Sequence, residues 1–149
     1  MMMKMKKEVC SAYMETAKNF AKCSTAKRLK VGAIVVDPST GAIISVGYNG
    51  MPSGMSNVCE EKRDGVLRTK TAVLHAEENA IAKLARSTTS SEDSWMFVTH
   101  SPCIRCAKLI ISSGIARVFY NEQFNGNVGC GLDLLRKGSV RCIHIGEKK

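Results

Sequence analysis

The chain has 149 residues, enough for one domain with a proper core, and it contains no run of about 18 apolar residues that could span a membrane. Its 22 Lys and Arg against 13 Asp and Glu give a formal net charge of +9, which favours anionic partners without choosing between nucleotides and nucleic acid. The aromatic content of 5% disfavours a surface that stacks the bases of a single strand, so no nucleic-acid partner is expected. The cysteine count is odd and the start of the chain lacks the apolar stretch of a signal peptide, so we expect reduced thiols and one cytoplasmic domain over residues 1–149.

The hydrophobic pattern predicts alternating helices and strands. Val9, Tyr13 and Ala17 recur at helical spacing, so an amphipathic helix is expected near the N-terminus. Short apolar runs rich in β-branched residues predict strands, and an intervening turn rich in Pro, Ser, Thr and Gly predicts that the first two are antiparallel. In chain order we expect a helix at 6–23, strands at 31–36 and 42–48, a long functional loop at 49–71, a helix at 74–85, a strand at 95–99, a helix at 103–113, a strand at 117–120, a helix at 131–137 and a strand at 140–145.

The order of these elements predicts the fold class. Strand, helix and strand in succession favour right-handed crossovers and parallel pairing, with helices covering the faces of the sheet. Combined with the antiparallel first pair, this predicts an α/β fold of three α-β-α layers around a five-stranded mixed sheet. Ligands in such sheets gather outside the carboxyl ends of the strands, so a functional site is expected there.

Two short motifs supply a set of metal ligands. His-Ala-Glu stands at residues 75–77 and Pro-Cys-Ile-Arg-Cys at residues 102–106. One imidazole and two thiolates, from His75, Cys103 and Cys106, suit zinc and leave its fourth position open, a geometry in which zinc lowers the pKa of water to about 7. The order of the motifs resembles the signature of zinc nucleobase deaminases, in which a glutamate beside the metal moves protons without binding it.

The spacing of the two motifs supports this interpretation unevenly. Cysteines three residues apart at the start of a helix share a face, and the helix dipole favours their thiolate forms. His75 and Glu77 are two residues apart and would point about 200° from each other on an ideal helix, so both reach one metal only at a frayed or tilted first turn.

Simpler interpretations remain open for each of these residues. A lone Cys-x-x-Cys in a cytosolic chain is often a redox pair or half of a structural zinc site. No second Cys-x-x-Cys is present, although His100 could close a structural Cys2His2 site. Glu77 could be an ordinary surface residue of a helix, since glutamate is a good helix former.

The chain resembles the deoxycytidylate deaminases of the cytidine deaminase-like superfamily over residues 31–145. Beside the metal motifs, the resemblance rests on Gly-Tyr-Asn-Gly at residues 47–50, on Leu-His-Ala-Glu-x-Asn-Ala-Ile at residues 74–81 and on Cys-Ala-Lys-Leu-Ile at residues 106–110. Such enzymes convert dCMP and water to dUMP and ammonia, feeding dTMP synthesis, and the resemblance implies that reaction here.

The resemblance also implies roles for individual residues. It assigns the single catalytic zinc to His75, Cys103 and Cys106, proton transfer to Glu77, and substrate contacts to Asn49, Ala76 and Tyr120. Asn49 could instead be a left-handed turn residue beside Gly50, and Tyr120 an ordinary strand aromatic.

Regulation is a further implication of the resemblance. The family is activated by dCTP and inhibited by dTTP, with Mg²⁺ on the phosphates, in a homo-oligomer that is a hexamer. The Gly-Tyr-Asn-Gly loop and a cluster of cations before the first strand suggest the place of this second site. The candidate residues for it are Lys22, Arg28, Gly47, Tyr48 and Gly50.

Some relatives carry a second, structural zinc. Cys23 and Cys59 resemble two of its ligands, but the histidine and glutamate that complete it have no counterpart in residues 70–74. One zinc per subunit is therefore expected.

Four other functions are compatible with parts of the sequence. A deaminase acting on dCTP, or on both dCMP and dCTP, is the closest rival, because each phosphate needs only one more basic contact. A tRNA adenosine deaminase would use the positive charge, but such enzymes resemble Gly-Trp-Asn-Arg where residues 47–50 read Gly-Tyr-Asn-Gly. A free cytidine deaminase has a cysteine-first motif order, and a zinc-stabilised binding module would have a closed metal site.

Overall fold

The structure is a computed structural model that describes residues 5–124 and 130–146. Each expected helix and strand is present within two residues of its expected ends. The helices are α1 (Lys7–Ala21), α2 (Ala76–Ala85), α3 (Ile104–Ser112) and α4 (Leu132–Lys137). The strands are β1 (Gly32–Val36), β2 (Ile43–Tyr48), β3 (Glu60–Arg63), β4 (Val66–Thr69), β5 (Trp95–His100), β6 (Arg117–Glu122) and β7 (Arg141–His144).

Five strands form one mixed sheet in the order β2-β1-β5-β6-β7. β1 pairs antiparallel with both β2 and β5, whereas β5, β6 and β7 are parallel to one another. The parallel strands are connected through α3 and α4, which matches the strand and helix alternation of the sequence.

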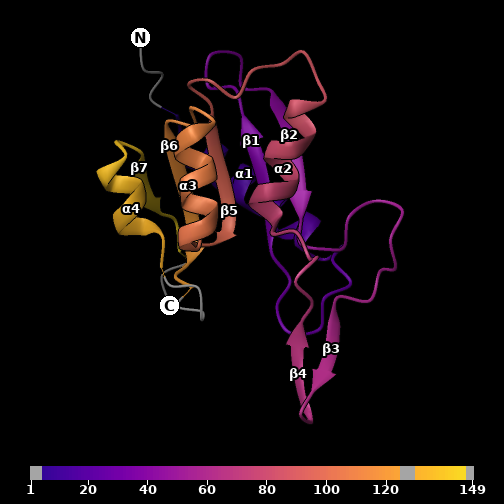
Figure 1. Ribbon diagram of the computed structural model, residues 1–149. Coiled ribbons are helices and arrows are strands. Elements are labelled where there is room, and N and C mark those ends of the chain that lie inside the picture. The colour runs from indigo at the N-terminus through magenta and orange to yellow at the C-terminus, as the bar shows by residue number, and fades with distance from the viewer. Residues whose placement is uncertain (1–4, 125–129, 147–149) are drawn as a thin grey trace.

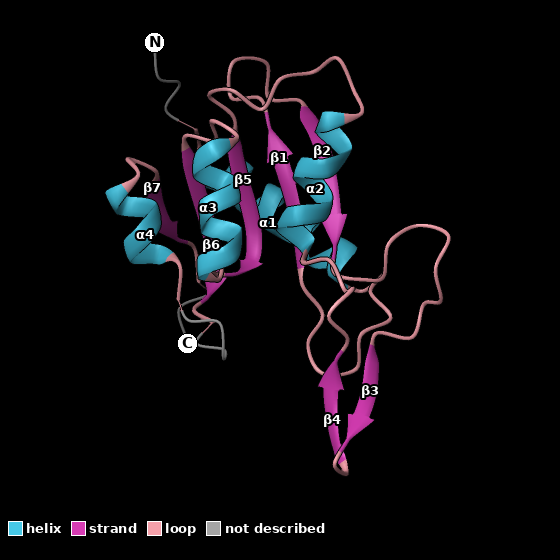
Figure 2. Ribbon diagram, in the orientation of Figure 1, coloured by secondary structure: helices cyan, strands magenta, loops and turns pink. Residues whose placement is uncertain are grey.

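Helices cover both faces of the sheet. In Figure 1, α2 and α3 lie in front of the strands and α1 lies behind them, and Figure 2 shows the same layers by type of structure. Alternate residues of the strands divide between two cores, because successive side chains of a strand point to opposite faces. Val35 and Val98 pack on the side of α2 and α3, whereas Ile34 and Phe97 pack against α1. The expected α/β fold with a five-stranded mixed sheet is confirmed.

The expectation that residues 49–71 form one long loop is wrong in its second half. There β3 and β4 form an antiparallel hairpin with Glu60 opposite Thr69, which extends away from the sheet (Figure 1). Asp64 and Gly65 connect the strands with φ angles of 52° and 76°, the left-handed pair that a type I′ turn requires. Asp-Gly is a strong hairpin signal, but β3 consists of four charged residues and β4 reads Val-Leu-Arg-Thr, so neither strand has the apolar alternation that marks a half-buried strand.

Within the described residues, none of the helices combines the length and the apolar character that crossing a membrane requires.

Candidate active site and metal centre

The predicted site lies where several strands end. β2, β5 and β6 end at Tyr48, His100 and Glu122, and the antiparallel β1 begins at the same edge with Gly32. The segments after β5 and before α2 carry the two metal motifs. The site therefore occupies the carboxyl end of the sheet, as expected for an open α/β fold.

His75 precedes α2 and is not part of the helix. It is the N-cap residue, with extended φ and ψ of −71° and 157°, and the helix begins at Ala76. Its backbone N–H donates to Glu78 Oε1 at 2.9 Å, which closes a capping box, and Arg105 Nη2 donates to the same oxygen at 3.1 Å. On an ideal helix, His75 and Glu77 would point in nearly opposite directions. Because His75 has an extended backbone and lies before the helix, this constraint does not apply, and both side chains can reach one metal.

Cys103 is the N-cap of α3, and Cys106 lies in its first turn. Cys103 has extended φ and ψ of −76° and 172°, and its carbonyl accepts the Ala107 N–H at 2.9 Å. Pro102 therefore lies one residue before the N-cap, outside the helix. Both thiols are buried. Two helix N-termini thus bring their cap residues to one point.

The three proposed ligands meet in space. His75 Nδ1 lies 3.2 Å from Cys106 Sγ and 3.5 Å from Cys103 Sγ, and the three ligand atoms all fall within 4.8 Å of one another. A tetrahedral zinc with Zn–N of about 2.0 Å and Zn–S of about 2.3 Å places nitrogen and sulfur about 3.5 Å apart. The chemistry and the spacing of these atoms therefore fit a zinc ion bound through Nδ1.

The protonation of the two thiols is unequal. A hydrogen bond from Cys106 lowers the pKa of Cys103 to about 3, and donating that bond raises the pKa of Cys106. The Cys103 sulfur also raises the pKa of His75 by hydrogen bonding to its ring. Zinc binds cysteine as thiolate, and the raised pKa of Cys106 means that binding a metal there would release a proton.

Glu77 is buried beside these ligands. It has an exposed fraction of only 4%, and burial raises the pKa of its carboxyl to about 7. A carboxyl with a pKa near neutrality can both take up and give back a proton, as a general acid and base must. The alternative of a surface helix residue is excluded by this burial.

A cavity of about 510 Å³ adjoins the ligands, a size that fits a nucleotide-sized ligand. His75, Glu77 and Cys103 line it together with Asn49 and Ala76, so the structure brings these predicted residues together. We call this space the metal-site cavity.

Asn49 acts on the backbone at the edge of this cavity. Its Oδ1 accepts the Val31 N–H at 2.8 Å and its Nδ2 donates to the Leu29 carbonyl at 2.7 Å. Its φ is not positive, so the alternative of a left-handed turn residue is excluded. Asn49 therefore ties the segment before β1 to the end of β2.

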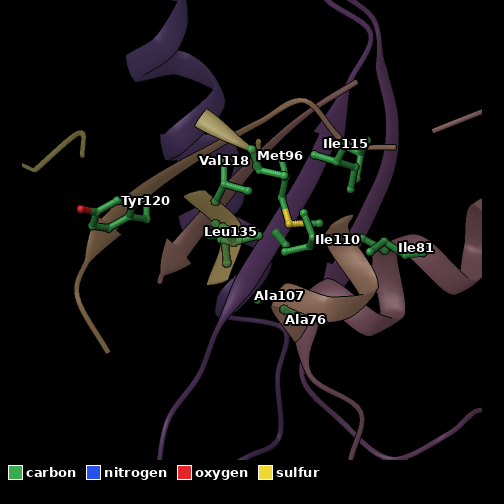
Figure 3. Packing of buried hydrophobic residues seen from close by; sticks show 14 of the residues in the cluster. Ala76, Ile81, Met96, Ala107, Ile110, Ile115, Val118, Tyr120 and Leu135 are labelled. Atoms are coloured by element: carbon green, nitrogen blue, oxygen red, sulfur yellow. The ribbon is translucent and has the colours of Figure 1, made fainter. Parts of the chain in front are cut away.

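Tyr120 does not line the metal-site cavity in the described residues. It belongs to the core that includes Val118 and Leu135, and Figure 3 shows its ring at the edge of that cluster, away from Ala76. Its ring lies 5.2 Å from that of His144. The geometry therefore favours the simpler interpretation of Tyr120 as a strand aromatic.

The five residues expected at a second nucleotide site are not all brought together. Tyr48 and Gly50 line a cavity of about 490 Å³, which we call the second cavity, whereas Arg28 lines the metal-site cavity. Lys22 is exposed and donates to Asn19 Oδ1 at 3.4 Å. Gly47 lies beneath α2, where a Cβ would meet the Ala76 carbonyl.

Lys83, Arg86 and Glu122 line these cavities but were not singled out from the sequence, and His100 was considered only as a ligand of a structural zinc, although it is not part of the ligand cluster. Lys83 and Arg86 line the second cavity, and their spacing of three on one helix is a signal that could have revealed them. His100 and Glu122 line the metal-site cavity and lie 3.3 Å apart, from His100 Nε2 to Glu122 Oε2. Nothing in the sequence indicates that pair, because the two residues meet only when β5 and β6 pair.

The comparisons with known proteins agree with this site. Residues 7–122 match the family model described as the cytidine and deoxycytidylate deaminase zinc-binding region. The chain therefore belongs to this family of zinc-binding deaminases. The deoxycytidylate deaminase of Enterobacteria phage T4 is 32% identical over 157 residues, covering 80% of each chain. That of Homo sapiens is 42% identical over 95 residues, covering 61% of this chain and 52% of the human protein.

A solved structure supports the same assignment. The dCMP deaminase of cyanophage S-TIM5 in complex with dCMP and dUMP superimposes with a TM-score of 0.86 at 43% identity, covering 95% of this chain and 99% of that one. An A-to-I editing deaminase that acts at the wobble position of transfer RNA has a TM-score of 0.61 at 23% identity, which shows a shared fold alone. The expected family and the expected enzyme class, a zinc-dependent deaminase of the dCMP deaminase type, are confirmed.

Proposed function

We propose that this chain converts dCMP and water to dUMP and ammonia. The observation that carries the proposal is the cluster of His75, Cys103 and Cys106 beside the buried Glu77 at the wall of a nucleotide-sized cavity. The chain is 32% identical to one dCMP deaminase and 43% identical to another over most of its length, and this similarity supports the choice of substrate.

The chain's own residues divide the work. His75, Cys103 and Cys106 would hold zinc, which when bound supplies the acidified water that hydrolysis at neutral pH requires. The Glu77 carboxyl would take one proton from the attacking water and deliver it to the ring nitrogen, and then take the remaining proton of the added hydroxyl and deliver it to the departing amine, so that each proton delivered is one that it has taken up. The backbone at Ala76, on the cavity wall, holds the pyrimidine beside this carboxyl.

The two roles in the site can be separated by substitution. We expect Glu77→Gln to keep zinc and lose about 10²- to 10⁴-fold in turnover, because it removes only the proton carrier. Cys103→Ser is expected to lose both zinc and turnover, because it removes a ligand. Ammonia release and zinc content measured on each purified variant test this. Substantial turnover in the zinc-loaded Glu77→Gln variant would contradict the assignment of Glu77.

The rival substrates are tested with the wild-type protein. Ammonia release should be fastest from dCMP when it is compared with dCTP, deoxycytidine and an adenosine-bearing tRNA stem-loop. A preference for dCTP or for the RNA would transfer the proposal to that substrate and leave the zinc chemistry unchanged.

Regulation by dCTP and dTTP with Mg²⁺ is proposed at the second cavity. Beside Tyr48 and Gly50 it is lined by Lys83 and Arg86, two cations that suit the phosphates of a triphosphate. Lys83 Nζ also donates to the Val46 carbonyl at 2.7 Å and lies 5.9 Å from the centre of the Tyr48 ring. These residues replace Lys22, Gly47 and Arg28 in the proposed site.

Two connections link the second cavity to the metal site. Asn49 lines both cavities. Gly50 pairs with Leu74, the residue before His75, through hydrogen bonds of 3.1 and 2.9 Å. A ligand that shifts the loop at residues 49–50 would therefore act on the segment that holds a metal ligand.

Kinetics test the proposed regulation. With Mg²⁺ present, dCTP should raise and dTTP should lower the rate at low dCMP, and Arg86→Gln should weaken both effects while the rate without effectors stays unchanged. Saturation curves that do not move with either triphosphate would contradict the proposal.

A homo-oligomer, with the hexamer as the expected form, is also proposed, and its mass in solution can be measured by light scattering.

A further inference from the structure

An ion pair joins the two helices whose starts carry the metal ligands. Arg105 lies in the first turn of α3, between the ligands Cys103 and Cys106. Its Nη2 donates to Oε1 of Glu78, in the first turn of α2, at 3.1 Å. In the described part of the chain, this is the one hydrogen bond from α2 to α3, apart from the contacts that His75 makes with the two thiols. The proposed deamination chemistry uses neither side chain.

The Glu78 oxygen that accepts this bond also holds the first ligand. The His75 backbone N–H donates to the same Oε1 at 2.9 Å, as the capping box requires. Both side chains of the ion pair remain partly exposed, at 21% for Glu78 and 48% for Arg105, and ion pairs in such positions add little to the stability of a fold. The pair is therefore better explained by where it places the ligands than by the stability that it adds.

The two ligand segments are otherwise anchored to different parts of the fold. Leu74, in the segment before α2, forms two backbone hydrogen bonds with Gly50, which follows β2. The Pro102 carbonyl, in the segment before α3, accepts the N–H of Gly131, which precedes α4, at 2.8 Å. Neither of these bonds runs from one ligand segment to the other, whereas the ion pair joins the two helices directly.

A zinc ion needs all three ligand atoms at one point, and these atoms lie within 4.8 Å of one another. A site whose ligands are already held in place binds its metal more tightly, because less conformational freedom is lost on binding. Side chains that hold metal ligands without touching the metal typically change metal affinity by about 10- to 100-fold. A bond between α2 and α3 is suitably placed for this role.

We propose that Glu78 and Arg105 position the starts of α2 and α3 for zinc and thereby raise the affinity of the site for this metal. The inference rests on the proposed function, which requires zinc at this site. Glu78 and Arg105 are positioning residues, because neither of them lines the metal-site cavity.

The sign of the effect distinguishes positioning from simple electrostatics. Arg105 is a cation beside a site for a divalent cation, so Coulomb repulsion alone predicts that Arg105→Gln binds zinc more tightly. Loss of positioning predicts the opposite, weaker zinc binding by about 10- to 100-fold. Arg105→Lys should recover part of this loss, because it keeps the charge without the planar fork.

Zinc affinity is measured on the zinc-loaded chain by competition with a chelator of known affinity. Glu78→Gln should also weaken zinc binding, although less than Glu78→Ala, because glutamine still caps the helix. The double variant Glu78→Gln/Arg105→Gln should lose no more than the larger of the single losses, because both substitutions remove the same bond. Lys108→Gln is the matched control, because it removes a positive charge from an exposed position of the same helix, and it should not weaken zinc binding.

The outcomes are separate from those for the proposed function. Zinc binding by Arg105→Gln that equals or exceeds that of the wild type overturns the inference, and so does an equal loss in Lys108→Gln or a double variant whose losses add. A melting temperature that falls at saturating zinc while the zinc affinity stays unchanged would show a structural role alone and would also overturn it. If the variants behave as expected but the wild type releases no ammonia from dCMP, the positioning role is supported and the proposed function fails.

Discussion

Asn49 illustrates how a polar side chain can organise a site without doing chemistry. Its amide satisfies the backbone N–H of Val31 and the carbonyl of Leu29, two groups in the segment before β1. We expect Asn49→Ala to lower the free energy of unfolding by about 1–3 kcal/mol, because it leaves both groups without their partner. Asn57→Ala, at an exposed position, should have little effect. Chemical denaturation of both variants measures the difference, and equal losses would contradict this role.

His100 predicts a pH dependence of stability. Burial lowers its pKa below the ordinary value of 6.5, an effect that Glu122 partly opposes. The unfolded chain then binds this proton at a higher pH than the folded chain does, so the stability from His100 is complete above the unfolded pKa and is lost as the pH falls through the folded pKa.

Thermal unfolding between about pH 7 and about pH 5 tests this sign. With excess zinc present, the wild type should lose more stability over that interval than His100→Gln, whose side chain does not titrate. Parallel curves for the two proteins would show that His100 does not carry the effect.

At the scale of elements, the contact between β2 and α2 determines where the catalytic residues lie. Gly47 has no room for a side chain, because a Cβ would meet the Ala76 carbonyl and lie 2.6 Å from the Ala80 backbone nitrogen. The absence of a side chain lets α2 approach the strand, and the first turn of that helix carries Glu77.

Gly47→Ala should therefore push α2 away from β2. We expect it to lower the free energy of unfolding by about 1–3 kcal/mol, as overpacking does, and to reduce turnover because Glu77 moves with the helix. Gly50→Ala is a close control, since a Cβ there would meet nothing within 4 Å. Denaturation and ammonia release on both variants measure the effect, and a fully stable Gly47→Ala protein would argue against the close packing.

At the scale of the whole molecule, the metal ligands join two helices that lie apart in the sequence. His75 precedes α2 and Cys103 precedes α3, so a zinc ion held by these residues would connect the two helices. Removing it with a chelator should lower the melting temperature, and added zinc should restore it. A metal ion whose free concentration is 100 times its Kd adds about 2.7 kcal/mol to the free energy of unfolding.

The number of zinc ions is part of the same prediction. Metal analysis should find one zinc per chain in the wild type and in Cys23→Ser, and none in Cys106→Ser, because Cys106 belongs to the ligand cluster and Cys23 is an exposed thiol. Two zinc ions in the wild type, with one lost in Cys23→Ser, would contradict this prediction.

The sequence alone was sufficient for every element except β3 and β4, for the fold class and for the cluster of metal ligands. Those inferences rest on local signals: apolar periodicity, short motifs and the chemistry of imidazole and thiol groups. The one wrong element, the loop at residues 49–71, had its own local signal in Asp64 and Gly65, although neither strand beside that turn has the apolar alternation that would have supported it.

Only the tertiary structure decided which cavity each cation lines. Arg28 was grouped with Lys22 because the two are near in sequence, but Arg28 lines the metal-site cavity, where its backbone N–H donates to the buried Glu60. Tyr120 was expected near the substrate, but strand alternation directs it into the core. Burial of a carboxyl and the meeting of residues on different strands depend on how the layers pack, and no short stretch of sequence contains that information.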